Sequence, residues 1–134
     1  MYDPRKALIT VPEILPMTFS ACPYFRQRWM EYRQHLSDSD DSDYVDLVYL
    51  ARFVIEEYEC GQEATVGLIF RLTEVVFNQG NEPAKHAFEV GFLEALQSLA
   101  SWKRYGVEAF TRWLEPRSKM VWDGLTLSSR LQKT

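Results

Sequence analysis

Only two of the 134 residues are cysteines, Cys22 and Cys60, and they lie too far apart in the sequence to form a CxxC pair. An extracellular domain held by disulfides would usually carry more of them. We therefore expect a reducing, intracellular setting in which both are structural thiols. Histidine is equally scarce, with two residues, and no P-loop, GxGxxG or HExxH motif occurs. The sequence thus predicts that the protein is not an enzyme, with no catalytic residues and no cofactor.

Long apolar runs are missing too. Charged residues interrupt every hydrophobic stretch well before the roughly 20 residues that a helix needs to cross a bilayer. Residues 1–10 lack the basic start and apolar core of a secretory signal. We therefore expect a cytoplasmic protein without membrane association. Its composition, 46% hydrophobic and 25% charged, is ordinary for a folded protein, and its length fits a single domain over residues 1–134, whose helical character the apolar spacing below predicts.

Basic residues are outnumbered by acidic ones, 15 to 19, so the net charge is −4 and the pI is about 5.2. Phosphates would be repelled by such a chain, which disfavours nucleic acid as a partner.

The alternating pattern of a β-strand is missing as well, whereas helical spacing of apolar residues runs through almost the whole chain. Thr10 and Glu13 form a capping box that opens a short helix, which Pro16 limits to about one turn. A stripe at helical spacing then follows, made of Phe25, Trp29, Tyr32 and Leu36.

Three longer helices are predicted at about residues 44–60, 62–79 and 83–105, with Gly61 and Gly80 between them. Because the links are short, neighbouring helices should run antiparallel. The predicted fold is all-α: a single-domain antiparallel bundle of about five to seven helices, with a short helical-repeat-like core over residues 44–105.

The last part of the chain is predicted to hold shorter pieces. A segment at residues 107–114 is followed by one turn of helix that Pro116 begins and that contains Trp122. Residues 126–134 have little to bury, so we expect this tail to fray.

What the chain has in excess is a local concentration of acid. Nine of its nineteen carboxylates fall within residues 37–63, where the only basic residue is Arg52 and the net charge is −8. Residues 37–43 are predicted to form a solvated acidic loop. Three glutamates also occupy a predicted helix end, where the dipole favours cations and no nearby Lys or Arg offsets them.

We interpret these nine acids as a partner-binding surface, because sequences that break a local rule often do so for function. The alternative is that an exposed helix end tolerates a cost of a few tenths of a kcal/mol. The predicted partner-binding residues are Asp38, Asp40, Asp41, Asp43, Asp46, Glu56, Glu57, Glu59 and Glu63.

The aspartates of the acidic loop also suggest calcium, but their spacing does not fit a calcium-binding loop. Counted from Asp38, the position that needs glycine holds Asp43, and the position that needs a bidentate glutamate holds Tyr49. The spacing therefore predicts a hydrated loop without a metal.

Two further constellations are candidates for chemistry. His86 has Glu82 and Glu89 about one turn away on the same helix face, but a second group of donors is missing, so surface hydrogen bonding is favoured over a metal-dependent enzyme. Glu74 and Glu94 lie in apolar runs, yet they are about 12 Å out of register on antiparallel helices. Arg71 is better matched to Glu89, which predicts an ion pair.

Five segments and one tryptophan resemble a family of small all-helical bacterial proteins of uncharacterised function. They are Tyr58-Glu59-Cys60-Gly61-Gln62-Glu63, Phe70 to Phe77, Gln79-Gly80-Asn81-Glu82, Phe92-Leu93-Glu94-Ala95-Leu96 and Leu114-Glu115-Pro116-Arg117-Ser118, with Trp122. The similarity covers roughly residues 25–125 and consists mostly of helix ends and core positions. The aspartate run has no counterpart in it.

Some members of that family are thought to be immunity proteins of polymorphic or contact-dependent toxins. The resemblance therefore implies a non-enzymatic, cytoplasmic binding protein that neutralises a cognate toxin, here through an acidic surface that steers association. The family has no catalytic residues to transfer. The alternative is a helical interaction or regulatory module that binds a housekeeping protein.

Overall fold

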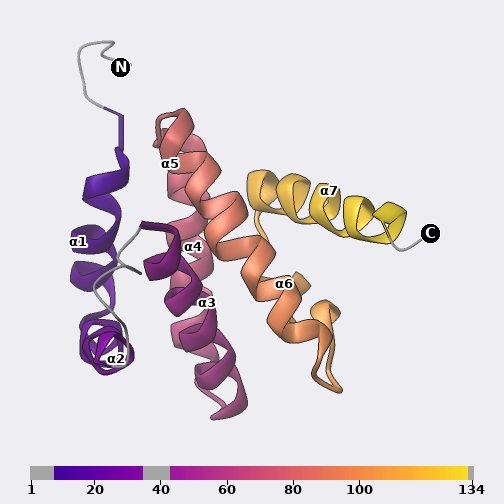
Figure 1. Cartoon of the computed structure of the whole chain (residues 1–134), viewed down its shortest axis with the longest axis horizontal. Coiled ribbons are helices and arrows are strands. Elements are labelled where there is room, and N and C mark those ends of the chain that lie inside the picture. The colour runs from indigo at the N-terminus through magenta and orange to yellow at the C-terminus, as the bar shows by residue number, and fades with distance from the viewer. Residues whose placement is uncertain (1–7, 35–42, 133–134) are drawn as a thin grey trace.

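Helices make up nearly all of the chain that the structure describes. The computed structural model describes residues 8–34 and 43–132, and for residue 43 and residues 127–132 it describes the backbone alone. Within these ranges seven α-helices form one domain without a β-strand (Figure 1), which confirms the predicted all-α fold. The elements are α1 Val11–Ala21, α2 Pro23–Arg33, α3 Asp43–Glu59, α4 Glu63–Gln79, α5 Glu82–His86, the π-helix η2 Ala87–Leu93, α6 Glu94–Ser101, the 3-10 helix η3 Val107–Trp113 and α7 Pro116–Gln132.

The central element is α3, which packs against α2, α4, η2 and α6. The segments α5, η2 and α6 follow one another as one long rod beside α3, while α7 lies on the opposite side of this rod from α1, at a steep angle to it, and packs on α4 (Figure 1). The chain end before α1 is tied to the α4–α5 corner, because Ile9 donates to the carbonyl oxygen of Gln79 at 2.9 Å and accepts from the N–H of Asn81 at 2.8 Å. Residues far apart in the sequence thereby close one end of the domain.

Phenylalanine dominates the core. Ring contacts join four elements around Phe70 of α4, whose centroid lies within 6.5 Å of rings on η2, η3 and α7. Such aromatic pairs stabilise a core beyond the area that they bury. The phenylalanines with at most 1% of their surface exposed are Phe25, Phe53, Phe70, Phe88, Phe92 and Phe110.

The first helix starts as predicted and ends later than predicted. The carboxylate of Glu13 accepts hydrogen bonds from the backbone N–H and the hydroxyl of Thr10, at 3.0 and 2.8 Å. The helix then continues through Pro16 to Ala21. Proline removes one backbone hydrogen bond inside a helix, but Ile14 and Thr18 bury the same face of α1 in the core and hold both halves together.

The C-terminal helix also differs from the prediction. The helix α7 has 17 residues where the sequence predicted one turn, and Trp122 anchors it with only 2% exposure. That the tail at residues 126–134 frays stays a prediction. The acidic loop at residues 37–43 lies outside the described residues, except for Asp43, which begins α3.

Candidate functional site

The nine predicted partner-binding acids do not form one described surface. Asp38, Asp40 and Asp41 lie outside the described residues, and only the backbone of Asp43 is described, at the start of α3. The remaining five lie on α3 and at the first residue of α4, and they are Asp46, Glu56, Glu57, Glu59 and Glu63. Each of these five has its own environment.

Asp46 faces the core side of α3, with 5% of its surface exposed. Its carboxylate accepts a hydrogen bond from the indole Nε1 of Trp29 at 2.8 Å and pairs with Arg33 at 3.3 Å. Both partners belong to α2. Asp46 therefore ties α2 to α3 and is not available to a partner.

Glu56 holds the same two helices together further along α3. Its carboxylate accepts from the guanidinium of Arg28 at 2.7 Å and from the hydroxyl of Tyr32, and Arg52 lies 3.5 Å away. Burial alone would raise the pKa of Glu56, but the hydrogen bonds from Arg28 and Tyr32 outweigh it, so this pKa lies below its usual value. Burial and the bond to Glu56 raise the pKa of Tyr32.

Glu57, the next residue, is 8% exposed. Burial raises its pKa, the charge of Glu56 adds to that rise, and Arg28 opposes it. Glu57 is close enough to Cys22 to help raise the pKa of that thiol, of which burial is the main cause. This carboxyl group is consequently an interior group and not part of an acidic face.

Glu59 and Glu63 lie on either side of the α3–α4 corner. Glu59 accepts from Lys103 at 3.0 Å and from the hydroxyl of Tyr105 at 2.9 Å, and these bonds lower its pKa. Glu63 pairs with Arg112 of η3. Two ion pairs therefore bridge the corner, one to the segment after α6 and one to η3.

The prediction that no cation offsets the acids at the end of α3 is wrong. Glu56 and Glu59 are compensated by cations that lie 28 and 44 positions away in the sequence, Arg28 and Lys103. A search for nearby cations along one helix cannot find partners that tertiary packing supplies. Neutralisation of this kind leaves little negative potential at the end of α3.

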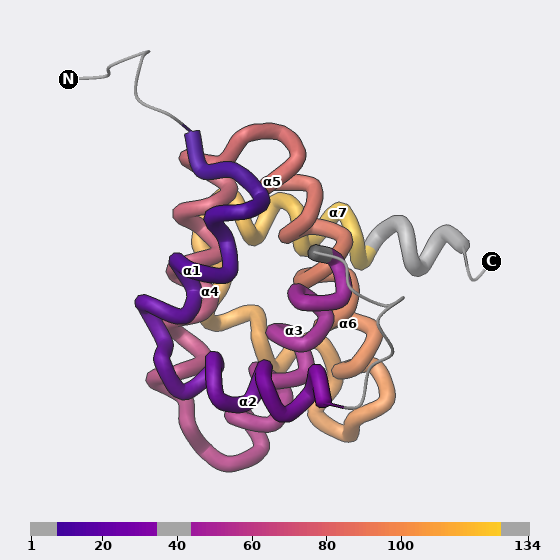
Figure 2. The backbone as a smooth tube through the Cα atoms, turned by 60° about the vertical axis from the view of Figure 1, so that its left-hand side comes forward, coloured from indigo at the N-terminus to yellow at the C-terminus, as the bar shows by residue number. Residues whose placement is uncertain are grey.

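The most exposed large apolar side chain of the described residues lies beside these ion pairs and was not among the predicted site residues. Trp102, directly after α6, is 88% exposed. Its neighbour Lys103 bonds to Glu59. The backbone after α6 lies at the same end of the molecule as the α3–α4 corner (Figures 1 and 2). The feature of the sequence that could have indicated this exposed residue is a tryptophan two positions after Ala100, the last buried residue of α6. We call Glu59, Glu63, Trp102, Lys103 and Arg112 the corner surface.

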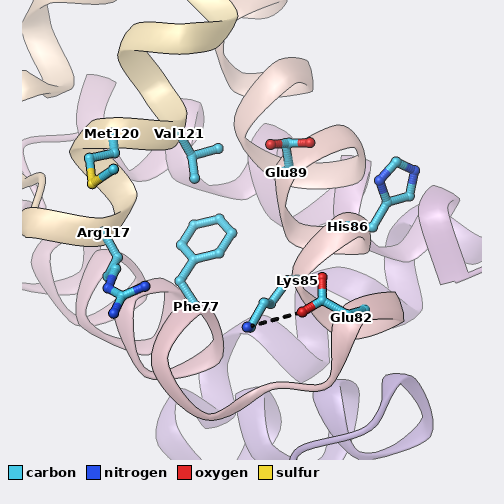
Figure 3. Close-up of a pocket in the computed structure, with 8 residues that line it drawn as sticks. All are labelled: Phe77, Glu82, Lys85, His86, Glu89, Arg117, Met120 and Val121. Atoms are coloured by element: carbon cyan, nitrogen blue, oxygen red, sulfur yellow. Dashed lines mark hydrogen bonds and ion pairs between the residues drawn. The ribbon is translucent and has the colours of Figure 1, made fainter.

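A pocket of about 300 Å³ lies at another place, between α4, α5, η2 and α7 (Figure 3). In the figure, Phe77 stands in the middle, the side chains of Arg117 and Lys85 lie on either side of it, and Glu89 lies beyond its ring. The lining residues are Phe77, Glu82, Lys85, His86, Glu89, Arg117, Met120 and Val121.

The wall of this pocket that α7 forms is fixed by a carboxylate of α4. Glu74 accepts from the backbone N–H groups of Ser118 and Arg117, at 2.9 and 3.0 Å, and so caps the first turn of α7. Burial opposes ionisation of Glu74, but these hydrogen bonds outweigh it and lower its pKa. Glu74 therefore has a capping role. Glu94 is exposed on α6, so the two carboxylates do not form a pair.

The pocket also contains the histidine considered as a metal ligand. Lys85 pairs with Glu82 at 3.4 Å, and the imidazole of His86 packs edge-on against Tyr44, with centroids 6.2 Å apart. Among the residues that the structure describes, no three His, Cys, Asp or Glu side chains are placed to hold a metal ion. Nor do the described helices include one of sufficient length and apolarity to traverse a bilayer.

The comparisons with known proteins give one match. A family model described as a domain of unknown function, DUF7674, matches residues 18–128. The matched range begins in α1 and ends in α7, so it includes both the corner surface and the pocket. Searches of curated proteins and of solved structures returned no significant match.

Proposed function

The chain belongs to the DUF7674 family, a domain of unknown function, and we propose that it is a non-enzymatic protein-binding module, specifically a cytoplasmic immunity protein that neutralises a cognate bacterial toxin. It would act by occupying the toxin's active site or substrate path. The resemblance of its helix ends and core segments to uncharacterised bacterial proteins, some of them thought to be immunity proteins, motivates the choice of a toxin as the partner.

The observation that carries the proposal is the exposure of Trp102. An indole that is 88% exposed leaves a large apolar surface in water. Tryptophan is also the residue type most enriched among the few side chains that dominate binding energy in protein interfaces. A rigid helix end that presents such a side chain fits a binding surface better than a packing role.

The ion pairs at the α3–α4 corner suit the rim of the same interface. Glu63 and Arg112 are each more than half exposed, and Glu59 and Lys103 about 40% exposed. Exposed pairs of this kind contribute little to folding stability, about 0–1 kcal/mol, so a partner can exchange them for its own charges at small cost. This gives Glu59 and Glu63 a role in the rim, in place of the uncompensated acidic face predicted from the sequence.

The test uses the toxin domain encoded by the adjacent reading frame. Substitution Trp102→Ala should weaken its binding by about 30-fold or more, since a central aromatic anchor contributes about 2 kcal/mol or more. Isothermal titration of the purified proteins measures this. The matched control is Met30→Ala on α2, which removes another exposed apolar side chain, 53% exposed, and should leave the affinity unchanged.

Protection of cells gives the second readout. Cells that express the toxin domain should survive with the wild-type protein and lose that protection with Trp102→Ala. Killing that the wild-type protein leaves undiminished, together with no detectable complex, contradicts the toxin assignment. Capture of a housekeeping protein through Trp102 in the same cells would instead support the alternative interaction module.

A further inference from the structure

We propose that the pocket between α4, α5, η2 and α7 is a binding site for a small aromatic monocarboxylate. The site is separate from the corner surface and does not depend on the function proposed above. Three properties of the pocket carry the proposal: its size, its apolar floor, and the placement of its charges.

The size of the pocket limits the ligand. A volume of about 300 Å³ is at the lower end of the range of small-molecule sites, about 300–1,000 Å³. A single substituted ring fits such a space, whereas a nucleotide or a folded segment of another protein does not. The pocket walls come from helices on both sides, so the shape is set by the fold and not by one loop.

The floor of the pocket is suited to an aromatic ring. Phe77 is otherwise buried, with 6% of its surface exposed, and it presents its ring to the pocket beside Val121 (Figure 3). Met120 borders the same space and is 73% exposed. A methionine side chain is flexible and its sulfur interacts favourably with aromatic rings, so Met120 can close over a ring that stacks on Phe77.

Charge placement determines the polar group of the ligand. The guanidinium of Arg117 makes no ion pair within the described part of the chain, and the backbone N–H of this residue is already bonded to Glu74. Lys85 approaches from the other side of Phe77, and its partner Glu82 is 89% exposed at a distance of 3.4 Å. A carboxylate can therefore bind Arg117 through two parallel hydrogen bonds and draw Lys85 from a weak pair.

The carboxylate of Glu89 disfavours a ligand that carries a second negative charge. Glu89 lies beyond the ring of Phe77 from the two cations (Figure 3). A dicarboxylate would place one of its charges near Glu89 and be repelled, while a monocarboxylate would not. The sequence prediction that Glu89 pairs with Arg71 is wrong, because Glu89 borders this pocket and forms no such pair in the described residues.

The experiment is a titration of the full chain with phenylacetate, followed through the methyl resonances of ¹³C-labelled methionines. The Met120 methyl should shift saturably, with a dissociation constant of about 1 mM, which is typical of so small a ligand. The methyl of Met30, on α2, should not shift. Phenylacetamide has the same ring and lacks the charge, so it should bind at least about tenfold more weakly.

Variants identify the groups that bind the carboxylate. Arg117→Gln should lower the affinity for phenylacetate about tenfold, and Lys85→Gln should lower it less. The matched control is Arg71→Gln, an exposed arginine on α4 outside the pocket, which should leave the affinity unchanged. Arg117→Gln keeps the backbone N–H that bonds to Glu74, so the fold is expected to persist, and circular dichroism checks this.

Three results would overturn the proposal. One is the absence of a saturable shift at Met120 in the folded wild-type protein. Another is equal binding of phenylacetamide and phenylacetate. The last is an affinity for phenylacetate that neither Arg117→Gln nor Lys85→Gln changes.

Discussion

Two consecutive glutamates of α3 illustrate how far the surroundings of a residue decide its chemistry. Glu56 points to Arg28 and Tyr32 of α2 and has a lowered pKa, although burial opposes this shift. Glu57 lies about 100° further round the same helix, is buried, and has a raised pKa. The sequence shows two identical side chains in a row and gives no sign of this difference.

Opposite effects on stability follow from the two environments. Glu56→Gln should lower the free energy of unfolding at neutral pH by about 1 kcal/mol, since it weakens a charged hydrogen-bond network that is partly exposed. Glu57→Gln should raise it by less than about 1 kcal/mol, because a neutral amide removes the penalty of ionising a buried carboxyl group. Urea unfolding of the two variants and the wild type measures both values.

The sign of the Glu57 effect also depends on pH. A raised native pKa means that the folded protein loses stability as the pH rises above the unfolded pKa and through the folded one. The free energy of unfolding of Glu57→Gln should therefore equal that of the wild type at acid pH and be higher than it at neutral pH. A variant that is less stable than the wild type at neutral pH would show that Glu57 makes a stabilising contact.

At the scale of single residues, the sequence indicated some of the acids at the corner surface and missed the cations and the tryptophan beside them. Glu59 and Glu63 do lie at the corner surface, yet each is paired with a cation. Trp102 was passed over because an apolar residue near a helix end looks like core in a one-dimensional pattern. Exposure is a property of the packed molecule, and only the structure shows that the indole has no neighbour to cover it.

At the scale of elements, prediction succeeded where local chemistry sets the boundary. Gly61 has a φ of +79°, a conformation that favours glycine, and it separates α3 from α4 as predicted. Asn81 caps α5 through a 2.9 Å hydrogen bond to the N–H of Ala84. These signals lie within a few residues of the helix end, which is why the sequence alone can reveal them.

The π-helix was not predicted, and it changes which residues share a face. One π-helical turn inserts an extra residue into the helical register. Glu89 lies near the start of η2, and η2 packs mainly against α3. Counting residues from Gly80 assumed that this helix lies directly beside α4, and so gave a wrong partner for Glu89. Nothing in the apolar spacing of this segment distinguishes an α-helix from a π-helix.

Two helical glycines provide a matched test of how closely the elements pack. A Cβ atom added to Gly91 in η2 would lie 3.1 Å from the Cβ of Leu47, whereas nothing lies within 4 Å of one added to Gly124 in α7. Gly91→Ala should therefore destabilise the protein by about 1–2 kcal/mol through overpacking against α3. Gly124→Ala should stabilise it by about 0.5–1 kcal/mol through higher helix propensity.

Thermal unfolding followed by circular dichroism compares these two variants with the wild type. Equal stabilisation by both alanines would mean that η2 and α3 are not in close contact. Such a result would also remove the support that η2 gives to the wall of the pocket.

At the scale of the whole molecule, the sequence predicted the fold class and could not predict the distribution of charge. A window of residues 37–63 carries a net charge of −8. The fold brings cations from α2, from the residues after α6 and from η3 to four of the acids in this window, Asp46, Glu56, Glu59 and Glu63. Linear charge density and surface potential are therefore different quantities in this protein, and long-range packing separates them.

The same pairing predicts how the whole domain responds to acid. Four glutamates have pKa values below the usual 4.5. Hydrogen bonds from Thr10 lower the pKa of Glu13, and hydrogen bonds from Lys103 and Tyr105 lower the pKa of Glu59. At Glu56 and Glu74, burial would raise the pKa, but hydrogen bonds outweigh burial and lower it. Below about pH 4.5 the unfolded chain binds more protons at these four sites than the folded protein does. Stability should therefore be fully present above that pH and lost as the pH falls through the folded pKa values.

Melting temperatures measured between about pH 6 and about pH 3 test this response. The wild type should lose stability steadily over the acid half of that range. At pH 6, Glu74→Ala should have a free energy of unfolding that is lower by about 1 kcal/mol for the lost cap, and hence a lower melting temperature. Its melting temperature should fall less on acidification, because one of the four carboxylates with a lowered pKa is gone. A melting temperature that is constant or rises toward acid would contradict the ion pairs and caps on which the packing of α2, α7 and the corner surface rests.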